Sequence, residues 1–580
     1  KSLAPELRPH PGKLNSMDEL VKHITALVQE CAVRDYVTEL LVSICRHDTS
    51  PSTDVDVMRQ AEAAVFDILE RQLAEAAFAG AHWERRPINP AIALHPAYSQ
   101  LHFTKTAERP QGLPPETVYA GRSNLLYFVP DAAGRELGGI ALNAHVDVIA
   151  PYIPPRVENG IVYGRGACDD KGAVVVIITA LRLLSQVLKK AGRKLKRNVV
   201  AMFVAEEETG GNGSLSLAID RDLKKLYDSI LVLECTGNNI HPANRGAVWY
   251  QVDLSCPGVN LFEMAAFVYE QLEWEGRAIK AESRHALFPQ RPVQTCHGII
   301  GHYGEHPSRI CGEVAFDLTF AGQVTPRVKE IVEDVIAAAL ADYIGLYGDK
   351  TKVADPTTGK PKVARHFDLE ETARGFVCRV HGSTGHMGSI MENDGAITKM
   401  AMFVRALVRS KSNLAATGGG DLTMSLHGEP TAASLKLEGG QGFVPTHSME
   451  DVMARMRSAA CQGADFYLRL TGQAAAATVT VSYDKLHNAA FDGDPDSPTM
   501  RNAIAAAKAV GMWKDQPMMG WTVSCDSRLF ATEYPGMPVI TSGAGLLQYA
   551  HSDAEQVKLD DLMASVAFVA TYILKEAGVV

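Results

Sequence analysis

Histidine and acidic side chains recur at five places along the chain, each beside a short apolar run or a glycine-rich turn. In chain order these segments are His145-Val146-Asp147, Cys168-Asp169-Asp170, Glu206-Glu207-Glu208, Leu233-Glu234-Cys235 and Ala550-His551-Ser552-Asp553. Imidazole and carboxylate donors without a thiolate pair suit a catalytic zinc ion, or manganese or cobalt. Any one segment alone has a simpler interpretation, as a surface pair, a helix cap or a solvated acidic run. Their meaning therefore depends on whether the fold gathers them.

Most of these segments adjoin an alternating pattern of strands and helices. Short apolar runs at 140–144, 199–204 and 229–233 predict buried strands, and a longer apolar stretch at 173–190 predicts a helix between the first two. This alternation predicts an α/β domain of three layers, with a mostly parallel sheet covered on both faces by helices. Because ligands bind at the carboxyl ends of parallel strands, we expect the histidines and carboxylates to meet at that edge.

The middle of the chain has a different pattern, which predicts an inserted second domain. From about Val248, strands alternate apolar and polar residues, as in a sheet with one solvated face, and the parallel α/β pattern returns after about Lys485. The expected division is a catalytic domain in two parts, 1–245 and 486–580, and an inserted α+β lid domain, 246–485. A strand–helix–strand set resumes at Phe376 after a polar loop at 347–362, which indicates two related units within the insert.

A capping box predicts where the first helix begins. Ser16 is followed three residues later by Glu19, and the apolar residues after it keep helical spacing as far as Cys31. Residues before Met17 are interpreted as an expression remnant or a processed end and are excluded from fold reasoning.

Composition excludes several classes of function. The 580 residues are 46% hydrophobic and 21% charged, with a net charge of −10, so no basic surface for nucleic acid is expected. The longest apolar runs are interrupted short of a membrane span. The ten cysteines are scattered, as expected for reduced thiols in a cytoplasmic protein rather than a disulfide framework.

Other catalytic patterns are missing from the sequence. Gly164-Arg165-Gly166 lacks the third glycine of a dinucleotide-binding loop, because Asp169 occupies that place. The sequence has no G-x-x-x-x-G-K-[ST] phosphate loop and no H-E-x-x-H helix, and neither Ser214 nor Ser383 lies in a G-x-S-x-G turn. All five segments fall at inferred strand ends, which favours a site whose ligands would be imidazole and carboxylate groups.

The order and the residues of these motifs resemble those of a known family. This is the dizinc metallopeptidase family that includes glutamate carboxypeptidase, acetylornithine deacetylase, succinyl-diaminopimelate desuccinylase, aminoacylase, carnosinase and the bacterial dipeptidase PepV. The matching segments, in the family's order, are the H-x-D at 145–147, the complete G-R-G-x-x-D-x-K-G at 164–172, the E-E-x-G at 207–210, an altered S-D-x-R read as Cys525-Asp526-Ser527-Arg528, and the G-x-G…A-H-x-x-x-E from Gly543 to Glu555.

The resemblance implies a site for two divalent metal ions, zinc above all. His145 and Glu234 would bind one ion, Glu208 and His551 the other, and Asp169 would bridge them. Two ions about 3.5–4 Å apart can hold a water molecule between them and lower its pKa to about 7.

The resemblance also implies the groups that act on the substrate. Glu207 would be the general base, and Asp147 would orient His145. His386, in Gly385-His386-Met387-Gly388-Ser389, would donate a hydrogen bond to the oxyanion from the lid domain. A cis peptide bond between Asp169 and Asp170 is expected as well.

The substrate contacts are less well marked. The backbone around Gly543 and Gly545 is expected to contact the substrate, and Arg309 and Arg379 are candidates to bind a substrate carboxylate, because the family's Asn-x-x-Pro turn is not evident. In the family, a glutamate at the position of Glu234 accompanies carboxypeptidases and deacylases, whereas a lid of doubled length resembles PepV.

These features together predict a hydrolase that cleaves an amide bond in a small peptide or an N-acyl amino acid, of carboxypeptidase or deacylase type. One alternative is a PepV- or carnosinase-like dipeptidase that needs a free amine. Another is a binding protein on this fold without catalysis. A monomer and a homodimer both fit the enlarged lid.

Overall fold

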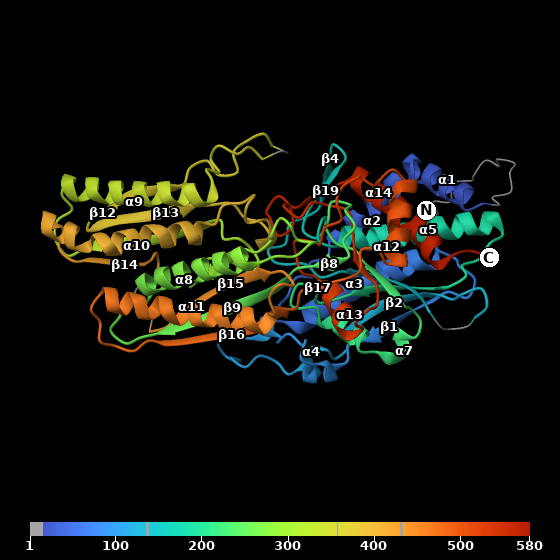
Figure 1. Ribbon diagram of the computed structural model, residues 1–580, viewed down its shortest axis with the longest axis horizontal. Helices are drawn as coiled ribbons and strands as arrows, with labels where there is room; N and C mark the ends of the chain where they lie inside the picture. The colour runs from blue at the N-terminus through green and yellow to red at the C-terminus, as the bar shows by residue number, and fades with distance from the viewer. Residues whose placement is uncertain (1–15, 135–137, 356–357, 430–432) are drawn as a thin grey trace. The chain divides into compact units, whose positions relative to one another are not determined.

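The computed structural model describes residues 16–134, 138–355, 358–429 and 433–580, and its chain forms two compact units (Figure 1). Unit 1 contains the chain up to Gly246, the short segment 285–290 and the chain from Lys485 onward; unit 2 contains the rest. The residues before Ser16 lie outside the described residues, as do two residues, 356–357, of the predicted loop at 347–362.

The segment 285–290 falls within the predicted insert but packs with unit 1. The side chain of Phe288 is completely buried, and the Leu287 carbonyl accepts a hydrogen bond from the Gly520 N–H at 2.6 Å. His285 Nε2 lies 3.1 Å from Asp492 Oδ2. The sequence of this segment resembles an ordinary loop, so its return to unit 1 has no local signal.

A six-stranded sheet in the order β1-β2-β6-β3-β7-β18 forms the centre of unit 1. The strands are β1 (His82–Pro87), β2 (Ser123–Val129), β3 (Gly139–His145), β6 (Asn198–Val204), β7 (Ser229–Val232) and β18 (Val539–Thr541). The pairs β6–β3, β3–β7 and β7–β18 are parallel, whereas β2 is antiparallel to both of its neighbours. The sheet is therefore mixed, and its four parallel strands end at one edge.

Alternate strand residues face two apolar clusters, which gives unit 1 three layers. Ile140, Leu142 and Ala144 lie in one cluster, whereas Ala141, which lies between Ile140 and Leu142 in the sequence, belongs to the other. The first cluster includes α1 (Met17–Val28), α2 (Cys31–Cys45), α3 (Val55–Ala74), α5 (Lys171–Ala191), α12 (Pro498–Ala509) and α14 (Leu559–Ala577). The second includes α4 (Pro115–Val118), α6 (Asn212–Ala218), α7 (Arg221–Lys224) and α13 (Ser527–Glu533).

Short elements complete unit 1. They are the three-stranded sheet of β19 (Gln556–Lys558), β5 (Ile161–Tyr163) and β4 (Arg156–Glu158), the pair β8 (Ala243–Asn244) and β17 (Phe491–Asp492), and the 3-10 turns η1 (Pro90–Leu94) and η2 (His102–Thr104).

The predicted first helix is two helices. The capping box at Ser16 and Glu19 is present and starts α1, but α1 ends at Val28 and Glu30 has an extended backbone before α2. The apolar spacing continues across the break, so the sequence pattern does not reveal it.

Helix α5 is the one helix among the described residues that is long and apolar enough to cross a membrane. Within unit 1, however, 89% of its apolar window is buried, and it packs on α14 and α2. These contacts are those of a core helix.

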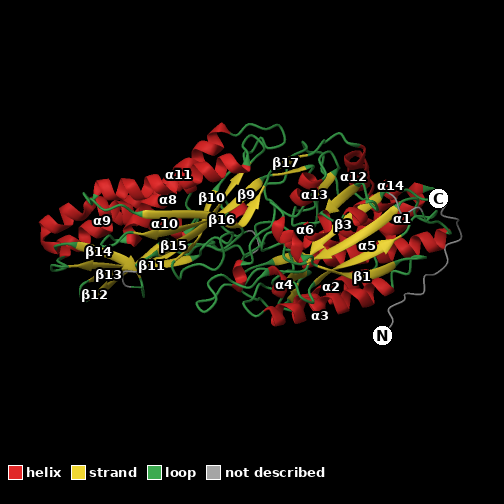
Figure 2. Ribbon diagram, turned by 90° about the horizontal axis from the view of Figure 1, so that it is seen from below, coloured by secondary structure: helices red, strands yellow, loops and turns green. Residues whose placement is uncertain are grey.

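Unit 2 contains two four-stranded sheets, with four long helices on one face (Figure 2). One half has β9 (Gly246–Ser255), β10 (Thr295–Ile300), β15 (Leu435–Phe443), β16 (Thr478–Asn488), α8 (Leu261–Glu282) and α11 (Met449–Leu470). The other has β11 (Glu313–Phe320), β12 (Phe367–Thr372), β13 (Gly375–His381), β14 (Leu422–Leu426), α9 (Pro326–Tyr347) and α10 (Ala396–Leu414). The second half is inserted between β10 and β15 of the first, so the two halves are nested rather than consecutive.

Candidate dinuclear metal centre

The acidic and histidine segments lie where the parallel strands of unit 1 end. His145 is the last residue of β3, Glu207 and Glu208 follow β6, and Glu234 follows β7. The loop with Asp169 precedes α5, and Asp170 is the N-cap residue of that helix. Neighbouring parallel strands thus bring together side chains that are far apart in the sequence.

Five of these side chains form two groups that share one carboxylate. In the first group, His145 Nε2 lies 3.2 Å from Asp169 Oδ1 and 3.9 Å from Glu234 Oε1. In the second, His551 Nε2 lies 3.3 Å from Asp169 Oδ2 and 3.0 Å from Glu208 Oε2. The potential ligand atoms of each group lie within 4.8 Å of one another, and all five residues are buried. Asp169 directs a different oxygen to each group, as a bridging ligand does.

The charges of the two groups fit divalent cations. Burial raises the pKa of Glu234 well above its usual range, and the nearby Asp169 carboxylate raises it further. Burial would lower the pKa of His551, but the Glu208 and Asp169 carboxylates outweigh it and raise this pKa to about 9. Without metal ions, the negative charge of these buried carboxylates is therefore offset by bound protons. Divalent cations in the two groups would offset the same negative charge. The nitrogen and oxygen donors suit zinc or manganese.

Asp147 contacts both His145 and the turn that carries Glu207. The Nδ1–H of His145 can donate to the Asp147 backbone carbonyl at 2.9 Å, whereas the Asp147 carboxylate lies 3.5 Å from this nitrogen. Its two oxygens accept the backbone N–H groups of Glu207 and Glu208, at 3.1 and 3.0 Å. The Asp147 side chain thus fixes the turn that carries Glu207 as well as facing His145.

Glu207 is the partly exposed member of the three consecutive glutamates. Burial raises the pKa of its carboxyl well above the usual range, and the buried Asp526 carboxylate raises it further. A carboxylate with a raised pKa is a stronger base near neutral pH. Asp526 belongs to the altered S-D-x-R segment, so this late motif affects the charge at Glu207.

Glu206 has a structural role that the sequence did not reveal. It is buried at a positive φ of 66°, and its carboxylate accepts hydrogen bonds from Arg122 and, at 2.9 Å, from the Tyr119 hydroxyl. Arg122 also binds Glu62 through two hydrogen bonds, at 2.9 and 2.5 Å. Arg122 lies 60 residues from Glu62 and 84 residues from Glu206 in the sequence, so no local spacing marks these contacts.

The family model described as Peptidase family M20/M25/M40 matches residues 141–575. The chain belongs to this family. It is accordingly a hydrolase, and each of the two groups that share Asp169 could hold a metal ion.

Curated relatives match part of the M20 chain. The LysW-lysine/LysW-ornithine hydrolase of Saccharolobus islandicus is 34% identical over 135 residues, which are 23% of this chain and 35% of that protein. A putative hydrolase of the same name from Pyrobaculum aerophilum is 27% identical over 202 residues, 32% of this chain and 53% of that protein. The chain thus spans about a third to a half of the length of these relatives.

Solved structures resemble the whole M20 chain. Human carnosine dipeptidase 1 has a TM-score of 0.54 at 14% identity, over 96% of this chain and 99% of that one. The dipeptidase Dug1p from Saccharomyces cerevisiae has a TM-score of 0.55 at 13% identity, over 97% and 98%. At this identity the likeness shows the shared fold, with its catalytic and lid domains.

Two backbone features of the M20 motifs are present in unit 1. The peptide bond between Asp169 and Asp170 is cis, as the resemblance implies. At Gly543 a Cβ would lie 2.4 Å from the Glu234 carbonyl oxygen, and at Gly545, with a φ of 88°, it would lie 2.7 Å from Cys168 Sγ. Glycine at both positions therefore lets this loop lie against the segments that carry Glu234 and Asp169.

The predicted residues of the insert lie in unit 2. His386 Nδ1 accepts a hydrogen bond from the Gly388 N–H at 2.9 Å, which leaves the ring proton of the neutral side chain on Nε2. Arg309 forms an antiparallel bridge with His386, so the two side chains share one face. Both arginines have a glutamate partner: Arg309 Nε lies 3.1 Å from Glu305 Oε2, and Arg379, on β13, pairs with Glu313 at 3.2 Å.

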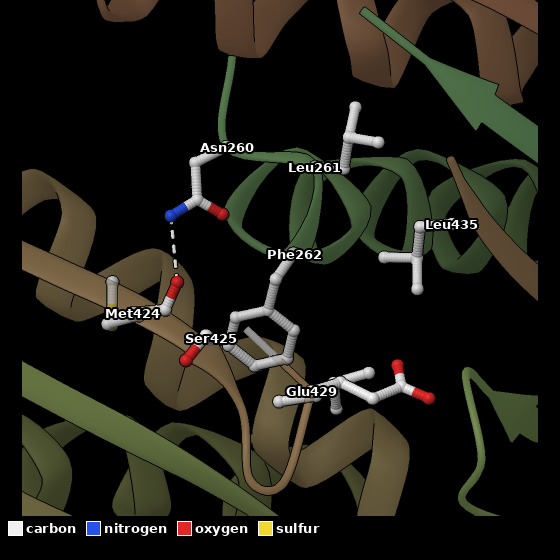
Figure 3. Close-up of a pocket in the computed structure, with 8 residues that line it drawn as sticks. Asn260, Leu261, Phe262, Met424, Ser425, Glu429 and Leu435 are labelled. Carbon is white, nitrogen blue, oxygen red and sulfur yellow. Dashed lines mark hydrogen bonds between the residues drawn. The ribbon is translucent and has the colours of Figure 1, made fainter. Parts of the chain in front are cut away.

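A hollow in unit 2 contains none of these site residues. It lies at the start of α8, where Asn260 Nδ2 donates to the Met424 carbonyl at 2.7 Å (Figure 3). Phe262 and Leu435 line it, with Glu429 as its acidic side chain. The hollow is therefore separate from the M20 chemistry.

Proposed function

We propose that the protein is a dinuclear metal-dependent amidohydrolase that cleaves an amide bond in a small peptide or an N-acyl amino acid, with the carboxypeptidase or deacylase type favoured. The observation that supports this most directly is the pair of buried ligand groups that share Asp169, with Glu207 beside them. His145, Asp169 and Glu234 would hold one ion, and Asp169, Glu208 and His551 the other.

In the proposed reaction the protein's own groups position and move protons. When bound, the ions polarise the scissile carbonyl and make the attacking water acidic. Glu207 takes the proton of this water and then gives it to the leaving nitrogen, which its raised pKa favours. Asp147 holds the Glu207 backbone during both transfers. His386 donates its Nε2–H to the developing oxyanion.

Two features support different substrate classes. Glu234 favours a blocked substrate, cleaved to release a C-terminal amino acid or an acyl group. The curated relatives, whose names give lysine or ornithine joined to LysW as their substrate, agree with an amino acid as one product. Arg309 beside His386 would bind the carboxylate of such a product. The nested double architecture of unit 2 instead supports the alternative, a dipeptidase that needs a free amine.

A matched substrate panel separates the two. The protein loaded with Zn²⁺ or Mn²⁺ is offered each dipeptide in free and N-acetylated form, with and without chelator, and the products are identified by mass spectrometry. Chelator-sensitive cleavage of the blocked member is expected. Cleavage of the free dipeptide alone would support the alternative, and absence of both tight metal binding and turnover would favour a binding protein without catalysis.

A further inference from the structure

A buried carboxylate outside the two ligand groups holds the loop that carries Asp169. The Glu555 side chain is fully buried, and its Oε1 accepts three backbone N–H groups of one loop. These belong to Gly166 at 2.9 Å, Cys168 at 3.2 Å and Asp169 at 3.1 Å. The Asp169 backbone is therefore attached directly to Glu555.

The other side of Glu555 binds the beginning of the same loop. Its Oε2 accepts from the buried Arg165 guanidinium, and its backbone carbonyl accepts the Gly164 N–H at 3.0 Å. Arg165 Nε donates to the Pro151 carbonyl at 3.2 Å. Apart from this bond to Pro151, every contact named here fixes the 164–169 loop against Glu555.

The position of Glu555 in the sequence connects the two ligand groups. It follows His551 by four residues, so one short segment supplies a ligand of the second group and the support for the bridging ligand of both. Displacement of the 164–169 loop relative to this segment would change the separation of Asp169 and His551, whose side chains now lie 3.3 Å apart.

We infer that Glu555 is a positioning residue for the dinuclear centre: it sets where the bridging carboxylate lies, and both metal sites depend on it. The inference rests on the proposed function, since it presupposes two bound ions. Residues that support metal ligands in this way typically change metal affinity by about 10–100-fold when substituted.

The hydrogen bonds predict a graded effect of substitution. Glu555→Ala removes both carboxylate oxygens, so three buried backbone N–H groups and the Nη1 group of Arg165 lose their acceptor, while the backbone carbonyl that accepts the Gly164 N–H remains. Glu555→Gln can still direct its oxygen to the N–H groups, but its NH₂ group then faces the Arg165 guanidinium. The Gln variant should therefore weaken metal binding less than the Ala variant.

Glu576 provides a matched control. It is a buried carboxylate that accepts hydrogen bonds from Ser229 Oγ, Thr499 Oγ1 and Asn502 Nδ2 at 3.2, 3.0 and 2.7 Å. Ser229 is the first residue of β7, whereas the ligand Glu234 follows the end of this strand. Glu576 thus lies at the opposite edge of the sheet from the ligands.

The experiment measures Mn²⁺ binding to the full chain after chelator treatment, by calorimetric titration and by electron paramagnetic resonance. The wild type is expected to bind two ions with the spin-coupled signal of a bridged pair. Glu555→Ala is expected to lose about 10–100-fold in affinity at both sites, together with the coupled signal. Glu555→Gln should lose less at both, His551→Ala should mainly weaken one site, and Glu576→Gln should match the wild type.

The outcomes separate this inference from the proposed function. Folded Glu555 variants that bind two ions with wild-type affinity and coupling would overturn the role of Glu555. If the Ala variant fails to fold, the Gln variant decides, because wild-type binding by this variant overturns the inference too. A wild-type protein that binds no Mn²⁺ or Zn²⁺ would instead refute the dinuclear centre itself.

Discussion

Three consecutive glutamates occupy three different environments beside the centre. Glu206 is buried against Arg122, Glu207 is partly exposed, and Glu208 lies with His551 in the second ligand group. Glu206 has a positive φ and is buried, whereas its neighbour Glu207 is partly exposed. A run of like charges usually marks a solvated surface. Here Glu206 supports the fold, Glu207 is the proposed base and Glu208 is a candidate metal ligand.

Glu207→Gln is expected to remove most of the activity without removing the metal. The amide cannot accept the proton of the attacking water, and general bases typically contribute about 10²–10⁴-fold to the rate. The ligand atoms of the two groups are unchanged by this substitution. Steady-state kinetics and a metal count on the same sample test it, and full activity in this variant would refute the mechanism.

His386→Ala is expected to lower kcat more than it changes KM. The Nε2–H of His386 would act on charge that develops in the transition state, and loss of one such donor typically costs about 10²–10³-fold in kcat. Arg309→Met serves as the comparison, since loss of a carboxylate contact should mainly raise KM. An unchanged kcat for His386→Ala would exclude it as the donor.

At the scale of elements, the strands that end at the site could be predicted from the sequence. The residues that hold the site through tertiary contacts could not. The structure places a strand at each of the predicted runs 140–144, 199–204 and 229–233, and the ligand candidates follow them. Apolar periodicity marks such strands because burial and backbone geometry act locally. Arg122 with Glu206, and Glu555 with the 164–169 loop, are pairs formed by tertiary packing, so their residues lie 84 or about 390 positions apart.

Glu206→Ala is expected to destabilise unit 1 by about 3 kcal/mol, because it leaves a buried Arg122 with one carboxylate partner fewer. Glu84→Ala is the control: its ion pair with Arg86 is partly exposed, and such pairs contribute about 0–1 kcal/mol. Urea unfolding compares the free energies of unfolding. Equal, small losses in both variants would contradict the role assigned to the buried pair.

A buried histidine predicts loss of stability in acid. Burial lowers the pKa of His241 to about 4, and its ring donates to the Met519 carbonyl at 2.8 Å. In the unfolded chain this histidine has a pKa near 6.5, so it binds a proton at a higher pH than in the folded protein. The stabilisation from the neutral buried ring is therefore present above about pH 6.5 and is lost as the pH falls towards 4. The shift corresponds to about 3 kcal/mol.

His241→Asn tests this contribution, because the amide NH₂ of asparagine can still donate to the Met519 carbonyl while carrying no titratable group. The difference in unfolding free energy between the two proteins should change between pH 6.5 and 4, with the wild type losing more. Parallel pH profiles would show that His241 does not titrate in this way.

At the scale of the whole molecule, the metal-ligand candidates are not shared between the two units. All five metal-ligand candidates belong to unit 1, and among the described residues no such group lies in unit 2. The segment 285–290 belongs to unit 1, so the chain passes between the units four times instead of the two expected of a simple insertion. Neither feature has a local sequence pattern, since both follow from which segments pack together.

This division predicts how metal removal affects unfolding. Each ion bound only by the folded state stabilises it by about 2.7 kcal/mol when its free concentration is 100 times Kd. Without ions, the buried carboxylates of Glu208, Glu234 and Asp169 must be balanced by protons, so unit 1 should unfold at a lower temperature in chelator. Among the described residues unit 2 supplies no member of either ligand group, so its transition should stay unchanged. Scanning calorimetry with and without chelator measures both transitions, with His551→Ala as a control expected to show a smaller shift.

A shift of unit 2 alone, or no shift in the wild type, would mean that the ions are not bound by these residues.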